Sequence, residues 1–146
     1  MLPRWHIIFG AVLTLFIWTI FPKLHFLYLI LIFLSSFLID FDHYVNATLR
    51  NKSFSLDKAF EYYEIKDKIL KEEIKKGIKK KEDEFQFFHP IEVHVAILVL
   101  GFLWQGFWFI FIGMLFHSLL DVASMYKAGY LHRREYFLVN WIRRKF

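Results

Sequence analysis

The chain has 146 residues, of which 57% are hydrophobic and 21% aromatic, and its net charge is +5 at pH 7. A soluble domain of this size cannot bury so much apolar surface in its own core, which leaves lipid as the solvent for the remainder. The absence of cysteine excludes disulfides, thiolate metal sites and cysteine nucleophiles. Basic residues are segregated from the apolar runs, which favours a membrane topology over nucleic-acid binding, so we expect no nucleic-acid partner.

Four apolar runs predict four transmembrane helices in an all-α protein. The runs cover about residues 5–21, 24–41, 91–104 and 107–125. Gly101 and Gly106 predict a tight turn between the third and fourth runs. The second run follows the first so closely that we expect the first to be a retained helix rather than a cleaved signal peptide. We therefore predict a single membrane domain over residues 1–146, built as a four-helix transmembrane bundle.

A charged region separates the second run from the third. Residues 50–84 carry eleven Lys or Arg and nine Asp or Glu, and apolar residues spaced three to five apart within 56–80 predict one or two amphipathic helices. This insertion is either a spacer, or else a lid or a surface that rests on anionic lipid headgroups. Its end, Lys79–Glu84, is predicted to be a solvated loop. The basic and aromatic tail, residues 132–146, is typical of a helix in the membrane interface.

The positive charges predict how the bundle is oriented. Four spans place the N-terminus, the insertion and the C-terminus on one side of the membrane, and only Lys23 of the basic residues lies on the other side. By the positive-inside rule the charged side is cytoplasmic. We therefore expect a multi-pass protein of the inner or plasma membrane, with a cytoplasmic insertion and both termini in the cytoplasm.

Histidine and acidic side chains from all four predicted spans fall at one depth, near the cytoplasmic face. Ionisable groups in or near a bilayer cost free energy, so their gathering in one layer predicts a site. Imidazole and carboxylate are the ligands that zinc, manganese and non-haem iron accept where no thiolate is present. The candidate metal ligands are His6, Asp40, Asp42, His43, His89, His94, His117 and Asp121.

Sequence spacing indicates which of these side chains share a helix face. His117 and Asp121 are four residues apart and lie on one face. Asp40 and His43, three apart, can do the same. Asp42 points elsewhere, either to a second metal ion or to the N–H of a ligating histidine. The residues predicted to bind the metal directly are His43, His94, His117 and Asp121, and the other four are predicted as further ligands or as groups that orient the ligands.

These motifs, in this order, resemble the small membrane-bound metal-dependent hydrolases typified by the bacterial YdjM-like inner-membrane proteins. The matching elements are Trp5-His6-Ile-Ile-Phe-Gly10, Ile39-Asp40-Phe41-Asp42-His43, the pair His89 and His94, and His117-Ser-Leu-Leu-Asp121. The resemblance covers most of the chain outside 50–84 and the tail, and it implies metal-dependent hydrolysis. Pro90-Ile91 stands where that family has arginine-glycine, a departure that points to a different substrate or to lost activity.

The sequence therefore predicts a membrane-embedded metal-dependent hydrolase that uses a divalent ion, zinc before manganese or iron. Glu92 is the predicted general base. A site at headgroup depth points to membrane lipid as the partner and to a lipid or lipid-linked phosphoester as the substrate. The alternative is a non-enzymatic membrane scaffold or metal-binding protein whose histidines are structural. A metal transporter ranks last, because the polar residues form one layer instead of lining the full depth of the spans.

Overall fold

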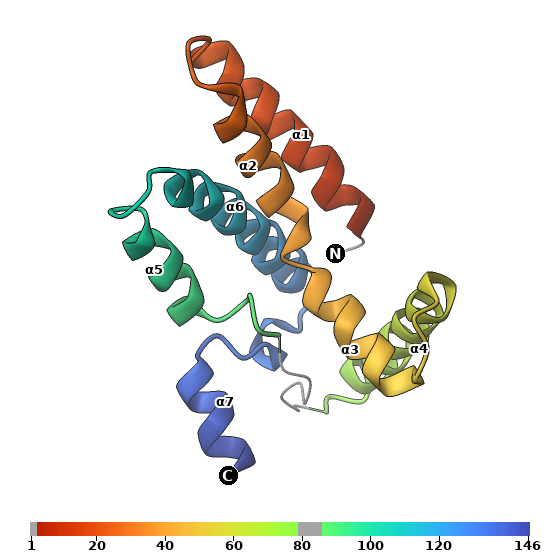
Figure 1. Cartoon of the computed structure of the whole chain (residues 1–146). Coiled ribbons are helices and arrows are strands. Elements are labelled where there is room, and N and C mark those ends of the chain that lie inside the picture. Colours follow the sequence, from red (N-terminus) through yellow and green to blue (C-terminus); the bar gives the residue numbers. More distant parts are fainter. Residues whose placement is uncertain (1–2, 79–85) are drawn as a thin grey trace.

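The computed structural model describes residues 3–78 and 86–146, and over these ranges it contains helices and no strand. The predicted all-α class is therefore confirmed for the described residues. The elements, shown in Figure 1, are α1 (Pro3–Ile20), α2 (Phe26–Leu38), α3 (Phe41–Asn51), α4 (Leu56–Lys75), α5 (Ile91–Leu100), α6 (Gly106–Lys127), the 3-10 turn η1 (Leu131–Arg133) and α7 (Leu138–Lys145). The predicted loop Lys79–Glu84 lies outside the described residues.

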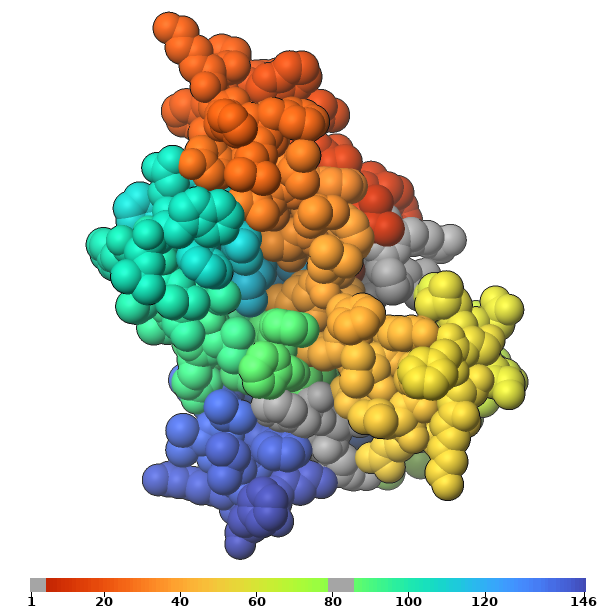
Figure 2. Space-filling model, in the orientation of Figure 1, coloured from red at the N-terminus to blue at the C-terminus, as the bar shows by residue number. Residues whose placement is uncertain are grey.

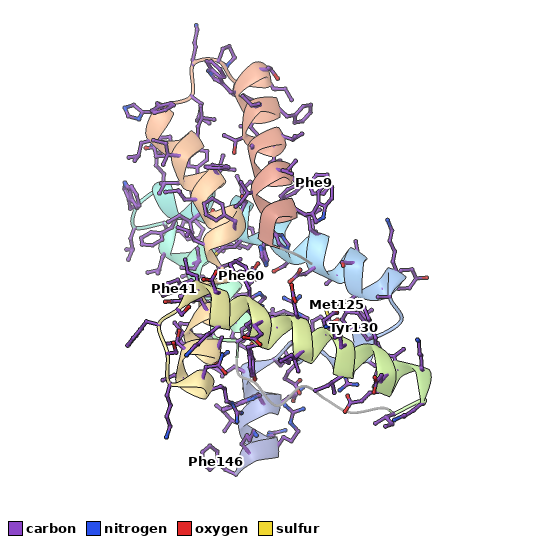
Figure 3. All side chains as sticks on the ribbon, turned by 90° about the vertical axis from the view of Figure 1, so that its right-hand side faces the viewer. Phe9, Phe41, Phe60, Met125, Tyr130 and Phe146 are labelled. Atoms are coloured by element: carbon purple, nitrogen blue, oxygen red, sulfur yellow. The ribbon has the colours of Figure 1, made fainter. Side chains whose placement is uncertain are left out.

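Among the residues that the structure describes, two helical stretches are long and apolar enough to cross a membrane. They are Phe26–Asn51, which joins α2 and α3 over 26 residues, and α6, with 22 residues, each with a mean hydropathy of 1.7. Large apolar side chains face outward over much of the bundle, and Figure 3 shows Phe9 pointing away from α1. A bilayer would cover such surface at little cost. The four-span topology and its orientation stay predictions.

The third predicted span is shorter than the sequence indicated. α5 has 10 residues, which rise about 15 Å, or about half the hydrocarbon thickness of a bilayer. The helix ends before Gly101, where a Cβ atom would lie 1.8 Å from Cδ1 of Trp108. The glycine therefore lets the chain turn back closely against α6, which confirms the predicted turn between 101 and 106.

Helix α2 lies between α1 and α6, and α5 packs on α6 (Figure 1). The charged α3 and α4 and the basic α7 extend from the end of the bundle opposite the α1–α2 turn, as Figure 2 shows. Helix α4 forms most of the described part of the predicted insertion, and the Tyr63 hydroxyl on it donates to the His43 carbonyl oxygen over 2.9 Å. The insertion is thereby fastened to the end of the bundle where the acidic and imidazole groups lie.

Replacing Gly113 with alanine is expected to destabilise the α2–α6 contact. A Cβ atom there would lie 2.0 Å from Ser35 Oγ and 2.4 Å from the Ile32 carbonyl oxygen, and backbone cannot move aside without shifting α2. Overpacking of this kind lowers the free energy of unfolding by about 1–3 kcal/mol. The thermal unfolding midpoint of the detergent-solubilised protein should fall by several degrees. Leu119→Ala, at a site 58% exposed on the same helix, is the control; equal midpoints for both variants would contradict the close approach.

Candidate metal centre

Four of the predicted residues converge into one cluster, which we call the Asp/His cluster. It consists of Asp40, His89, His117 and Asp121, and one ligand atom from each lies within 4.8 Å of the others. Asp40 comes from the joint between α2 and α3, His89 from the turn before α5, and the other two from successive turns of α6. Elements far apart in the chain thus place two imidazoles and two carboxylates together, in a largely buried setting.

The distances within the cluster suit a small ion. Asp40 Oδ1 lies 3.3 Å from His117 Nε2 and 3.6 Å from His89 Nε2. Asp121 Oδ2 lies 3.5 Å from His117 Nε2 and 3.9 Å from His89 Nε2. Ligand atoms that surround zinc tetrahedrally at about 2.1 Å are about 3.4 Å apart from one another. The cluster therefore has close to the spacing that such an ion requires.

Both histidines of the cluster are held with Nε2 facing the carboxylates. His117 Nδ1 lies 3.0 Å from the Ser36 carbonyl oxygen, and His89 Nδ1 lies 3.0 Å from Asp42 Oδ2. Each contact favours the tautomer that donates from Nδ1 and keeps a lone pair on Nε2. Within the described ranges, both Nε2 atoms are buried without a hydrogen bond of good geometry. Buried polar atoms are rarely left in this state, so the residues fit a bound metal ion.

Asp42 orients His89 through Oδ2, while its Oδ1 is buried without a hydrogen bond to the described residues. Its Oδ2 accepts from the Phe88 N–H over 3.2 Å as well as from His89. A second group, Asp42, His43 and His89, also has ligand atoms within 4.8 Å of one another. Because His89 Nδ1 and Asp42 Oδ2 already bind each other, the geometry favours one metal ion and an orienting role for Asp42.

Two further predicted histidines border the cluster. His6 is 0% exposed, its Nε2 lies 3.2 Å from Asp121 Oδ1, and its ring stacks on that of His117 with centroids 3.9 Å apart. Neither nitrogen of His6 has a hydrogen bond of good geometry. His43 Nε2 lies 3.4 Å from Asp40 Oδ1. Both imidazoles are thus placed to accept a proton at the edge of the cluster, or to complete the coordination of an ion.

The structure does not bring His94 or Glu92 into the cluster. His94 Nδ1 lies 3.1 Å from the Pro90 carbonyl oxygen at the start of its own helix, and Nε2 lies 3.0 Å from Ser118 Oγ on α6, so both nitrogens have partners outside the cluster. The Glu92 carboxylate accepts from the N–H groups of Leu138 and Val139 and caps α7. Both side chains therefore have partners away from the cluster, and the ligand role of His94 and the base role of Glu92 stay predictions from the sequence.

Arg134 is a component of the site that the sequence did not reveal. Its Nη1 donates to Asp121 Oδ2 over 3.2 Å, and its side chain is 6% exposed. The chain reverses after α6 at Gly129, with φ of 76°, and the Tyr130 N–H donates to the Met125 carbonyl oxygen. Figure 3 shows Met125 and Tyr130 at this reversal. A glycine just past a helix end was the one sequence signal that the tail folds back toward α6.

Two carboxylates act on the pKa of the His89 imidazole. Burial lowers this pKa, but Asp40 and Asp42 outweigh that effect and raise it above its ordinary value. A metal ion at Nε2 requires the unprotonated nitrogen and therefore competes with protons for it. We therefore expect metal binding to weaken as the pH falls.

Comparison of the chain with known protein families, with curated proteins and with solved structures finds no match. The resemblance to YdjM-like hydrolases stays a prediction from the motifs, and the interpretation of the site depends on its geometry.

Proposed function

We propose that the protein is a membrane-embedded metal-dependent hydrolase with one divalent ion held by the Asp/His cluster. One observation carries the proposal: the His89 and His117 Nε2 atoms are buried, lack hydrogen bonds of good geometry, and face two carboxylates at ligand spacing. Two imidazoles and two carboxylates suit zinc best, and manganese or iron are the alternatives. An ion of this class supplies Lewis acidity and lowers the pKa of water toward neutrality.

His6 replaces Glu92 as the proposed general base. A base must lie within reach of the proton that it accepts. The His6 Nε2 atom is buried beside Asp121, 3.2 Å from its Oδ1, whereas the Glu92 carboxylate is engaged at the start of α7. Stacking on His117 and the contact with Asp121 hold the imidazole at the edge of the cluster.

The proposed substrate is a lipid or lipid-linked phosphoester. The cluster gathers around the joint between the apolar α2 and the polar α3, against α6, and so lies beside a boundary between apolar and polar segments. The apolar part of such a substrate would lie among the apolar helices and its phosphate at this boundary. Hydrolysis would join a water oxygen to phosphorus and break the P–O bond to the alcohol, with one water proton passing by way of the base to the departing oxygen. The resemblance to YdjM-like hydrolases agrees with this reaction class.

Metal add-back tests the proposal. Protein in nanodiscs is stripped with a chelator and resupplied with zinc, manganese or ferrous ion, and release of water-soluble phosphate from a panel of lipid phosphoesters is followed by mass spectrometry. We expect turnover that requires about one equivalent of metal. The control variant His25→Ala, at the start of α2, should retain this turnover. Gently extracted protein that neither contains nor takes up stoichiometric metal would contradict the proposal and favour the scaffold alternative.

A further inference from the structure

Helices α2 and α3 share one outward face, and that face is apolar throughout. Every exposed residue between positions 27 and 49 is apolar, and successive residues along this face are three or four positions apart. We call this face the outward stripe, and it consists of Leu27, Ile30, Leu34, Leu38, Phe41, Val45 and Leu49. The stripe continues past the joint at which Asp40 enters the Asp/His cluster.

The polar residues of α3 lie on its inward side. Residues 41–49 include Asp42, His43, Asn46 and Thr48, and none of these four is exposed. Asp42 and Thr48 are buried. A helix on the surface of a water-soluble protein has the opposite arrangement, with its polar residues outward and its apolar residues in the core. The outward side of α3 therefore fits an apolar surrounding.

The helix that precedes the cluster is too short to cross a bilayer alone. From Phe26 to Asp40 the chain rises about 21 Å, whereas the hydrocarbon layer of a bilayer is about 30 Å thick. The difference of about 9 Å corresponds to about six further residues of helix, a length that includes Phe41 and Val45. The basic residues Arg50 and Lys52 follow just beyond, where they would meet lipid headgroups.

Helix α6 shows the same pattern beside the cluster. Its exposed residues between positions 107 and 124 are all apolar, and they are Trp108, Ile112, Leu115, Leu119 and Ala123. Exposed Tyr126 and Lys127 follow, and both residue types are typical of the membrane–water interface. Both long helices thus keep an apolar outward face before and after the residues that they contribute to the cluster.

We propose that the outward stripe contacts lipid acyl chains as far as Val45 and that the Asp/His cluster lies inside the hydrocarbon layer, about 9 Å along α3 from its surface. This inference does not depend on the proposed hydrolysis. The stripe suits lipid better than a second copy of the chain, because its side chains are large, whereas helices that pair in membranes approach through small residues. Figure 3 shows α4 running across the direction of α1, so the charged α4 can lie along the membrane surface while α1 crosses the bilayer.

Spin labels on single cysteines test this depth, since the chain has no cysteine of its own. Labelled variants Leu34→Cys, Phe41→Cys and Val45→Cys are placed in liposomes of phosphatidylcholine and phosphatidylglycerol. Collisions of each label with oxygen, which concentrates in lipid, are compared with collisions with a water-soluble nickel chelate. We expect oxygen collisions to exceed nickel collisions several-fold at all three positions, with the ratio falling from Phe41 to Val45. Lys68→Cys, exposed on α4, is the control and should show the reverse order.

Nickel collisions at Phe41 and Val45 as frequent as at Lys68 would overturn the proposal and place the cluster outside the hydrocarbon layer. Magnetic coupling between the labels of two copies would also overturn it, because a second copy would then cover the stripe. If Phe41→Cys does not fold, Val45→Cys alone decides, since Val45 reaches lipid only if the membrane extends past Asp40. Wild-type protein without zinc would overturn the proposed hydrolase and leave this inference standing.

Discussion

Replacing His117 with alanine is expected to remove nearly all bound metal. The His117 Nε2 atom faces both carboxylates of the cluster, at 3.3 Å from Asp40 Oδ1 and 3.5 Å from Asp121 Oδ2. Loss of a group that merely orients a ligand costs about 10- to 100-fold in metal affinity, so loss of the ligand itself should cost more. Zinc content after dialysis and competition with a chelating dye measure the effect.

His25→Ala is the matched control for this prediction. His25 lies at the start of α2, where its Nδ1 accepts from the Leu27 N–H over 3.2 Å, and it has no contact with the cluster in the described part of the chain. Its replacement should weaken a helix cap and leave the zinc content unchanged. Equal losses of zinc from the two variants would mean that the metal binds elsewhere or nonspecifically.

The cluster could be predicted from the sequence where helix geometry alone decides which residues meet. His117 and Asp121 share a face of α6 because they are four residues apart, and any regular helix preserves that relation. Asp40 was predicted at the cluster because it closes an apolar run. His89 was predicted because it precedes a helix that begins beside Pro90. Each of these positions follows from local rules.

The predicted site and the observed cluster differ where tertiary packing decides which side chains meet. Helix α5 is apolar nearly all round, so its pattern does not indicate which side faces α6, and the rotation that turns His94 toward Ser118 could not be read from it. Glu92 is engaged by the N–H groups of Leu138 and Val139, more than forty positions later in the chain. Arg134 reaches Asp121 only because the chain folds back after α6.

The bounds of the helices, too, could be predicted from the sequence only in part. The apolar run 24–41 predicted a helix that ends with the apolar residues, yet helix resumes at Phe41 and continues to Asn51. Hydropathy reports where an apolar environment ends, whereas helix propensity and capping decide where a helix ends. The polar α3 is therefore invisible to a search for spans, although its first turn carries Asp42 and His43.

Replacing Asp121 with asparagine is expected to lower the stability of the metal-free protein as well as its metal affinity. Asp121 is the carboxylate with which buried Arg134 pairs, and the two side chains are 11% and 6% exposed. Removal of one partner from a buried ion pair costs about 3–5 kcal/mol, because the other charge remains buried. The thermal unfolding midpoint of chelator-treated protein should fall clearly below that of wild type.

The double variant Asp121→Asn with Arg134→Met separates these two effects. Replacing both charges of a buried pair with groups of similar volume is often neutral or stabilising, so the double variant should regain much of the lost stability. Its zinc content should stay low, because the carboxylate ligand is still missing. Recovery of both stability and zinc would exclude Asp121 as a ligand. An Asp121→Asn variant as stable as wild type would mean that the buried guanidinium does not depend on this carboxylate.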